Sequence, residues 1–169
     1  MAKSFAFFAL LVSVVCFSSL LDLAQANKEK FHVEGKIYCD PCRLEFENRL
    51  STPLPGATVV LECKYENNET VTFKSKEVVT DQNGHYNIEA EGDHPEEENC
   101  KVTALKSSHP ECNDPMSGME SDRIVLTKNM GVRSKSRFVN SLGFMPKQVT
   151  NDQCKIVVAE LAENDKKDD

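Results

Sequence analysis

The sequence predicts an all-β domain, an antiparallel sandwich or barrel of about seven short strands that three disulfides hold together. Three observations lead to this prediction. Apolar and polar residues alternate with period two in several short segments, which is typical of half-buried strands. Turn-forming residues separate these segments, and no long segment has the period of a helix. An even number of cysteines follows a predicted secretion signal, and this indicates disulfides.

The start of the chain, residues 1–26, has the pattern of a removable signal peptide. Lys3 supplies a positive charge, and residues 5–21 are apolar apart from three serines. Ala24-Gln25-Ala26 then gives the small-x-small pattern that signal peptidase reads. An uncleaved membrane anchor is the alternative, but the cleavage pattern follows the apolar run directly. We therefore expect cleavage after Ala26 and secretion to the extracellular space.

About 143 residues remain after this cleavage, which suits one domain. We expect that domain to cover residues 27–160 and a charged, disordered tail to cover residues 161–169. The leader holds one lysine and one aspartate, so the net charge stays at -7. An acidic chain without a strongly basic face argues against nucleic-acid binding. No later segment is long and apolar enough to cross a bilayer.

The predicted strands are short, and turn-forming residues separate them. Asp81-Gln82-Asn83-Gly84 is a turn that tolerates positive φ, so residues 77–89 are predicted to form a hairpin. Residues 107–121 are predicted to be a long loop, residues 128–143 irregular, and residues 155–161 a last strand or a short helix. The other predicted strands cover residues 31–39, 57–63, 71–73, 100–104 and 124–126.

Cys39-Asp40-Pro41-Cys42 is the sharpest candidate for chemistry, because a Cys-x-x-Cys can lower a thiol pKa and exchange disulfides. Redox enzymes place this motif at a helix N-terminus in a βαβ unit, and no such unit is predicted here. Zinc binding would need a second closely spaced pair of Cys or His, which the sequence lacks. Structural disulfides are therefore favoured. If the strand continues, Cys39 and Cys42 point to opposite faces and reach different partners, but six cysteines still allow 15 pairings.

The remaining polar clusters have plainer explanations. Asp81 and Asn83 resemble the start of a calcium loop, but Gly92 stands where a Glu is required, so a turn is favoured. The acidic run over residues 89–98 is predicted to be a solvated loop. A basic stretch, which contains Lys128, Arg133, Lys135 and Arg137, is also predicted to be a solvated loop. The acidic loop and the basic loop both remain candidate contact surfaces.

The sequence predicts one modification site and no catalytic, cofactor or metal site. Asn68-Glu69-Thr70 is an N-glycosylation sequon between two predicted strands, which suits an exposed loop. No Gly-x-Ser-x-Gly nucleophile elbow occurs, and the four histidines are scattered along the chain. No spacing pairs two carboxylates across a cleft.

Several strings resemble the signature of the olive-pollen major allergen family, also called the pollen Ole e I and extensin family. The resemblance covers nearly the whole chain after the leader, from Phe31 to about Cys154. Members of this family usually carry Thr at the position of Pro41. The matching strings are Gly35-Lys36-Ile37-Tyr38-Cys39-Asp40-Pro41-Cys42-Arg43, Gly56-Ala57-Thr58-Val59-Val60-Leu61-Glu62-Cys63, Thr80-Asp81-Gln82-Asn83-Gly84-His85-Tyr86 and Asn140-Ser141-Leu142-Gly143-Phe144.

The resemblance implies a β-sandwich or barrel, and it also implies which cysteines pair. It implies a secreted, non-enzymatic plant protein from pollen or anther, with no cofactor. Some members are linked to pollen hydration and pollen-tube growth through receptor kinases at the cell surface, others are associated with the cell wall, and many are allergens. By analogy the pairs are Cys39 with Cys112, Cys42 with Cys154, and Cys63 with Cys100.

Two further hypotheses belong to other functional classes. A thiol-disulfide oxidoreductase using Cys39 and Cys42 requires a reducible, exposed bond between those two sulfurs. A carrier of a small apolar ligand requires a cavity inside the barrel. The favoured hypothesis is an extracellular binding or signalling factor.

Overall fold

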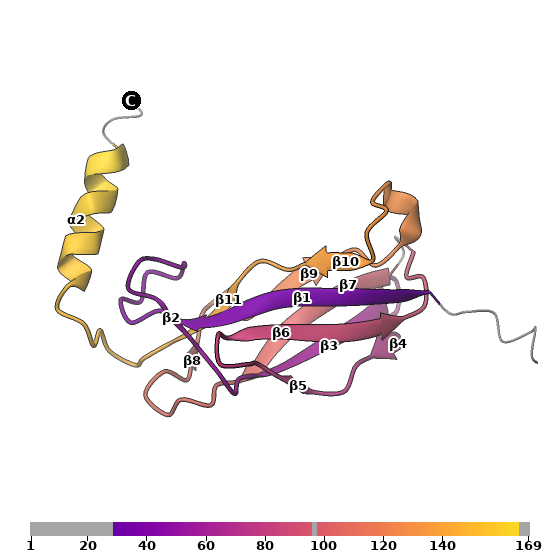
Figure 1. The fold of residues 1–169 in the computed structure, drawn as a ribbon, viewed down its shortest axis with the longest axis horizontal. Helices are drawn as coiled ribbons and strands as arrows, with labels where there is room; N and C mark the ends of the chain where they lie inside the picture. The colour runs from indigo at the N-terminus through magenta and orange to yellow at the C-terminus, as the bar shows by residue number, and fades with distance from the viewer. Residues whose placement is uncertain (1–28, 96–97, 166–169) are drawn as a thin grey trace, which may run out of the picture.

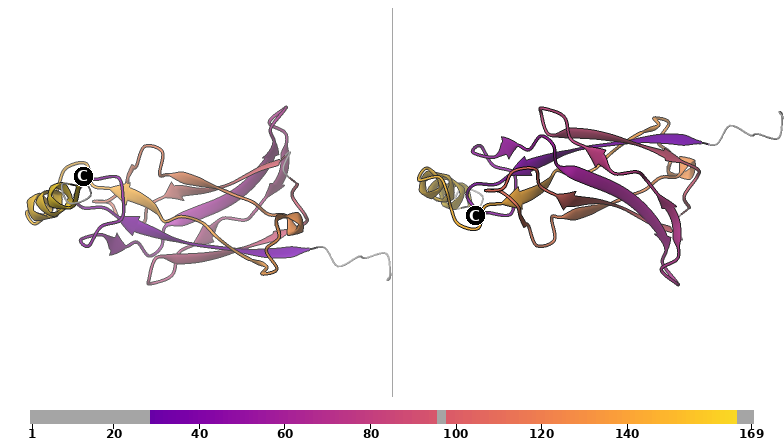
Figure 2. Two further views of the ribbon diagram at one scale, coloured as in Figure 1. Left: turned by 90° about the horizontal axis from the view of Figure 1, so that it is seen from above. Right: turned by 90° about the horizontal axis from the view of Figure 1, so that it is seen from below.

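The computed structural model describes residues 29–95 and 98–165. Two β-sheets face each other as a sandwich, and a helix extends from one end of it (Figures 1 and 2). The predicted all-β fold is confirmed. The predicted signal peptide and the last four residues of the predicted tail lie outside the described residues. No helix in the described part of the chain has the length and apolar character needed to span a membrane.

The first sheet is built around β1, which pairs antiparallel with β6 and β2 and parallel with β10 and β11. The sheet is therefore mixed, and the prediction of purely antiparallel pairing is wrong for it. Its strands are β1 (Lys30–Cys39), β2 (Thr52–Pro53), β6 (His85–Glu91), β8 (Asp114–Pro115), β10 (Ser136–Phe138) and β11 (Leu142–Met145).

The second sheet is antiparallel, and the β3–β7 pair is its longest ladder. In this ladder Cys63 stands directly opposite Cys100. The strands of this sheet are β3 (Thr58–Tyr65), β4 (Val71–Lys74), β5 (Val78–Val79), β7 (Glu98–Lys106) and β9 (Ser121–Ile124), and the helical elements are η1 (Lys128–Met130) and α2 (Cys154–Asp165).

The predicted hairpin over residues 77–89 is wrong, because its two strands belong to different sheets. β5 pairs with β3, whereas β6 pairs with β1 along its whole length. The turn itself forms: Gly84 has φ 76°, and the Asp81 carboxylate accepts the backbone N–H groups of Asn83 and His85. The carbonyl of Gly84 then accepts the N–H of Ile37 at 2.8 Å, which draws the turn onto β1. The turn could therefore be predicted from the local sequence, but the strands that pair with β5 and β6 could not.

Three other regions differ from the sequence predictions. The strand predicted over residues 124–126 is β9, three residues earlier, and the region predicted to be irregular holds η1, β10 and the start of β11. The chain end is helical to Asp165, so the predicted disordered tail is wrong for residues 161–165. Alanine, leucine and glutamate favour the helical state in this segment.

The inward faces of the two sheets meet in one apolar core. Phe31, Ile37 and Ile88 come from the first sheet, and Leu61 and Val102 come from the second. Each of these side chains is at most 1 % exposed. The buried cluster lies between the sheets, where the ligand-carrier hypothesis requires a cavity.

Candidate functional site

The two cysteines of the Cys-x-x-Cys motif belong to separate disulfides. Cys39 is bonded to Cys112, with Cα atoms 6.1 Å apart, and Cys42 is bonded to Cys154, with Cα atoms 5.3 Å apart. These are the pairs that the resemblance implies. The first bridge joins the end of β1 to the loop before β8, and the second joins the loop after β1 to the first residue of α2. The motif therefore offers no Cys39–Cys42 bond of the kind that disulfide exchange needs.

Between these two cysteines, Asp40 organises the following loop. Its side chain is fully buried, and its carboxylate accepts the backbone N–H groups of Cys42, Leu44 and Glu45. The side-chain amide of Asn48 donates to the same carboxylate at 3.0 Å. A buried carboxylate with this many donors fixes the backbone around it. The acidic residue of the motif thus has a structural role.

The basic stretch has two kinds of side chain, which the sequence did not separate. Lys128, Arg133 and Lys135 are exposed, as predicted. Arg137 is only 5 % exposed, so the prediction of a solvated side chain is wrong for it. It donates to the backbone carbonyls of Thr127, Ser134 and Ser136. Arg137 therefore anchors the loop over residues 128–135, which we call the basic loop.

Two further contacts hold the start of the basic loop. The Thr127 hydroxyl accepts the N–H of Asn129 and so caps η1, and Gly131 ends this turn with φ 79°. The carboxylate of Asp93 accepts the N–H of Lys128 at 3.1 Å. A hydrogen bond from the Thr127 side chain, followed by the one from Lys128, keeps the pKa of Asp93 below its usual value. The loop is thus tied to the neighbouring acidic segment.

Apolar side chains lie exposed in and beside the basic loop, which was predicted from its charges alone. Met130 and Val132 are 43 % and 44 % exposed, and Phe138 on β10 is 74 % exposed. Figure 1 shows the loop projecting from the same end of the sandwich as β10. Exposed Met, Phe and Arg side chains are enriched at protein interfaces. Apolar residues within a cationic run are the sequence signal that could have identified this surface.

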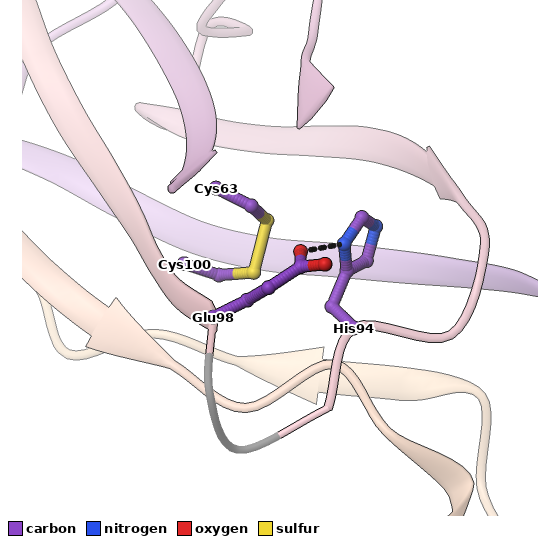
Figure 3. A group of neighbouring side chains, drawn as sticks. All are labelled: Cys63, His94, Glu98 and Cys100. Atoms are coloured by element: carbon purple, nitrogen blue, oxygen red, sulfur yellow. Dashed lines mark hydrogen bonds and ion pairs between the residues drawn. A yellow bond between two sulfur atoms is a disulfide. The ribbon is translucent and has the colours of Figure 1, made fainter. Parts of the chain in front are cut away.

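The acidic segment over residues 89–98 is only partly a solvated loop. Glu89 and Glu91 form exposed ion pairs with Lys30, at 3.7 and 3.5 Å. Glu98 instead pairs with His94: Nδ1 of the ring lies 2.7 Å from the carboxylate, and both side chains are less than a tenth exposed. Figure 3 shows this pair beside the Cys63–Cys100 disulfide. The prediction is wrong for Glu98, and residues 96 and 97 lie outside the described residues.

The glycosylation sequon lies in the turn between β3 and β4. Asn68 is exposed, and its side-chain oxygen accepts the N–H of Thr70 at 3.0 Å. An exposed turn of this kind is accessible to modification.

The family profile described as "Pollen protein Ole e 1 like" matches residues 29–162. The chain belongs to this family. It is 43 % identical over 151 residues to the anther-specific protein LAT52 of Solanum lycopersicum, an alignment that covers 89 % of this chain and 92 % of the relative. It is 42 % identical over 164 residues to the pollen allergen Che a 1 of Chenopodium album, with 95 % of each chain covered.

The fold of this Ole e 1-like protein also matches an experimental structure. The crystal structure of the major plantain pollen allergen Pla l 1 aligns with a TM-score of 0.64 and 34 % identity, over 73 % of this chain and 98 % of that one. The relatives are pollen and anther proteins, several of them allergens. These similarities identify the chain as a pollen-type protein of this disulfide-bonded β-sandwich family.

The strings through which the chain resembles other Ole e 1-like proteins pack against one another. A Cβ on Gly35 would lie 2.2 Å from the Tyr86 hydroxyl, and a Cβ on Gly143 would lie 3.0 Å from the Tyr38 ring. Tyr38 is fully buried, and burial, with the charges of Asp40 and Glu47, raises its pKa to about 12. These residues are explained by packing.

Proposed function

We propose that this protein is a secreted, non-enzymatic factor that supports pollen hydration or pollen-tube growth by binding a receptor kinase at the cell surface or a cell-wall component. One observation carries the proposal: all six cysteines after the predicted leader are joined in disulfides. Disulfides of this number form and persist in the secretory pathway and outside the cell. The signal-peptide pattern of residues 1–26 supports the same location.

The names of the relatives support the tissue. The anther-specific LAT52 and the pollen allergen Che a 1 align over most of both chains, so a role in pollen is the simplest inference. The structure supports a binding role in preference to thiol chemistry, because Cys39 and Cys42 are held in separate bridges. A rigid sandwich that presents projecting loops is a common arrangement for recognition.

The basic loop is the contact surface that we propose. Lys128, Arg133 and Lys135 offer positive charge on a molecule whose net charge is -7, and Lys135 also forms an exposed ion pair with Glu29 at 3.3 Å. Met130 and Phe138 add apolar area that a partner could bury. Such a surface suits an acidic partner with an apolar centre, because opposite charges steer the encounter and apolar burial prolongs it.

The test is a binding measurement with a charge-matched control. One variant carries Lys128→Ser, Arg133→Ser and Lys135→Ser, while Arg137 is kept because it anchors the loop. We expect affinity for pollen-tube surface membranes to fall about tenfold at low salt, since three exposed ion pairs contribute about 1–2 kcal/mol together. The difference from the unmodified protein should shrink as salt rises.

The control variant carries Lys76→Ser, Lys106→Ser and Lys147→Ser, which removes the same charge from exposed positions outside the loop. We expect it to bind nearly as well as the unmodified protein. If both variants lost the same affinity, the loss would be due to net charge alone. That result would contradict a specific role for the basic loop.

We also propose that Asn68 carries an N-glycan. Its exposed turn and the Asn-x-Thr pattern support this assignment. Treatment of the secreted protein with a glycan-releasing amidase should lower its mass and convert Asn68 to Asp. An Asn68→Gln variant should show no such change, and an unmodified Asn68 in the secreted protein would refute the assignment.

A further inference from the structure

Four side chains with metal-binding atoms meet at one place in the second sheet. They are the sulfurs of Cys63 and Cys100, Nδ1 of His94 and a carboxylate oxygen of Glu98, and these atoms all lie within 4.8 Å of one another (Figure 3). Two sulfurs, one imidazole nitrogen and one carboxylate oxygen are the ligand types that proteins use to hold zinc. In the oxidised protein the two sulfurs are bonded to each other, so neither is a thiolate ligand.

The surroundings of the cluster fit a closed, four-ligand metal site. Cys63, Cys100 and His94 are at most 7 % exposed, and the Glu98 side chain is 8 % exposed. The hydroxyl of Thr72 donates to the Glu98 carboxylate at 2.6 Å and orients it. The ring of Phe73 packs against the His94 ring, with centroids 5.4 Å apart. Neighbours that orient the ligands and exclude water are typical of structural zinc sites.

The backbone brings these side chains together whether or not the sulfurs are bonded. Cys63 and Cys100 are directly opposite in the β3–β7 ladder, so both side chains point into the same interior space. His94 is fixed by its own N–H, which donates to the carbonyl of Leu126 at 2.9 Å. Neither constraint depends on the disulfide. When both cysteines are thiols, the same four groups therefore remain neighbours.

We propose that Cys63, Cys100, His94 and Glu98 form a zinc site in the dithiol state of this protein, the state in which every chain is synthesised. Binding forms two Zn–S bonds and releases the two thiol protons. The proton that Nδ1 of His94 donates to Glu98 moves to Nε2 of the neutral ring, so that Nδ1 and the carboxylate can complete the coordination. A disulfide-carrying exchange protein of the secretory pathway then accepts two electrons from the thiolates and takes up two protons as its own thiols. The Cys63–Cys100 bond forms and the zinc ion is released. Zinc thus holds β3 against β7 until oxidation locks the pair.

This site could not be recognised from the sequence. His94 and Glu98 are four residues apart, but the two cysteines come from strands that are 37 residues apart in the chain. The Cys-x-x-Cys motif has the spacing of a zinc half-site, but its two cysteines are bonded to Cys112 and Cys154.

The test uses the full secreted chain, reduced with a phosphine under non-denaturing conditions and kept free of oxidant. Each cysteine is then alkylated with or without equimolar zinc and quantified by peptide mass spectrometry. We expect zinc to slow alkylation of Cys63 and Cys100 at least about tenfold, with a smaller change at the other four cysteines. Cobalt in place of zinc should give the strong visible absorption of a four-coordinate site with thiolate ligands.

Two variants decide whether the named ligands are responsible. His94→Ala should abolish the selective protection, and the matched control His109→Ala, which removes an exposed histidine, should keep it. Each variant is first checked for native disulfides and melting in its oxidised form, and Glu98→Gln replaces His94→Ala where the latter does not fold. Equal protection of all six cysteines, absence of protection, or selective protection that survives the loss of His94 or Glu98 would overturn the proposal. Equally tight zinc binding by the oxidised protein would overturn it as well.

Discussion

The guanidinium carbon of Arg137 lies 4.9 Å from the centre of the Phe31 ring, at the start of β1. The same guanidinium donates to the carbonyls of Thr127 and Ser136, at 3.1 Å in each case. One buried side chain therefore joins the first sheet to both ends of the basic loop. This contact distinguishes Arg137, which is buried and anchors the loop, from Lys128, Arg133 and Lys135, which are exposed.

The first prediction concerns this anchor. Arg137→Ser should lower the free energy of unfolding by about 2–4 kcal/mol, because it leaves buried carbonyls without a donor and removes packing on Phe31. Arg133→Ser, at an exposed position of the same loop, should change it by less than about 0.5 kcal/mol. Denaturant unfolding of both variants measures the difference, and equal stability would show that the contacts of Arg137 do not hold the loop.

The second prediction concerns the close contact between Gly35 and Tyr86. Gly35→Ala should destabilise the protein by about 1–3 kcal/mol, since the added methyl group would collide with a buried tyrosine. In a background carrying Tyr86→Leu, which removes the ring, the same glycine substitution should cost clearly less. A double-mutant cycle measures this coupling. Additive effects would mean that the two residues do not constrain each other.

The third prediction concerns the carboxylate of Asp40. Asp40→Asn places an amide where an acceptor faces three backbone N–H groups and the Asn48 amide. We expect a loss of about 2–4 kcal/mol, because buried donors lose their charged partner. Faster hydrogen exchange at Leu44 and Glu45 should accompany it. Replacement of the exposed Asp152 by Asn provides a control that should leave both measurements unchanged.

The fourth prediction is a pH dependence at the start of the basic loop. Hydrogen bonds from Thr127 and Lys128 lower the pKa of Asp93 in the folded protein. The contribution of Asp93 to the free energy of unfolding is therefore fully present above its unfolded pKa of about 3.9. That contribution is lost as the pH falls through the lower pKa of the folded state. Nuclear magnetic resonance should show the Lys128 amide shifting in that acid range. The shift should be absent in Asp93→Asn, and its persistence there would assign it to another group.

The sequence could predict the fold class because local signals agree with it. Alternation along residues 31–39 and 57–63 gave β1 and β3, and turn residues gave the breaks between strands. The same local signals could not say that β5 and β6 part into different sheets or that β10 and β11 return to pair parallel with β1. Strand partners depend on contacts between segments far apart in the chain, which no local period reports.

The candidate site was predictable only as a charge pattern. Lys128 and Arg137 look alike in the sequence, and their burial differs because only Arg137 reaches backbone carbonyls beside Phe31. The pairing of His94 with Glu98 could not be predicted for a similar reason. An acidic run is expected to be solvated, and only the folded chain shows that one of its carboxylates is buried beside a histidine.

The measurement that tests the central claim most directly is a disulfide map of the natively secreted protein, made by peptide mass spectrometry without reduction. If the protein is a secreted binding factor stabilised by disulfides, we expect three disulfides and no free thiol. Cys39 and Cys42 should then be bonded to distant partners. A bond between Cys39 and Cys42, or free thiols at both positions, would contradict this account and would favour a thiol-disulfide enzyme.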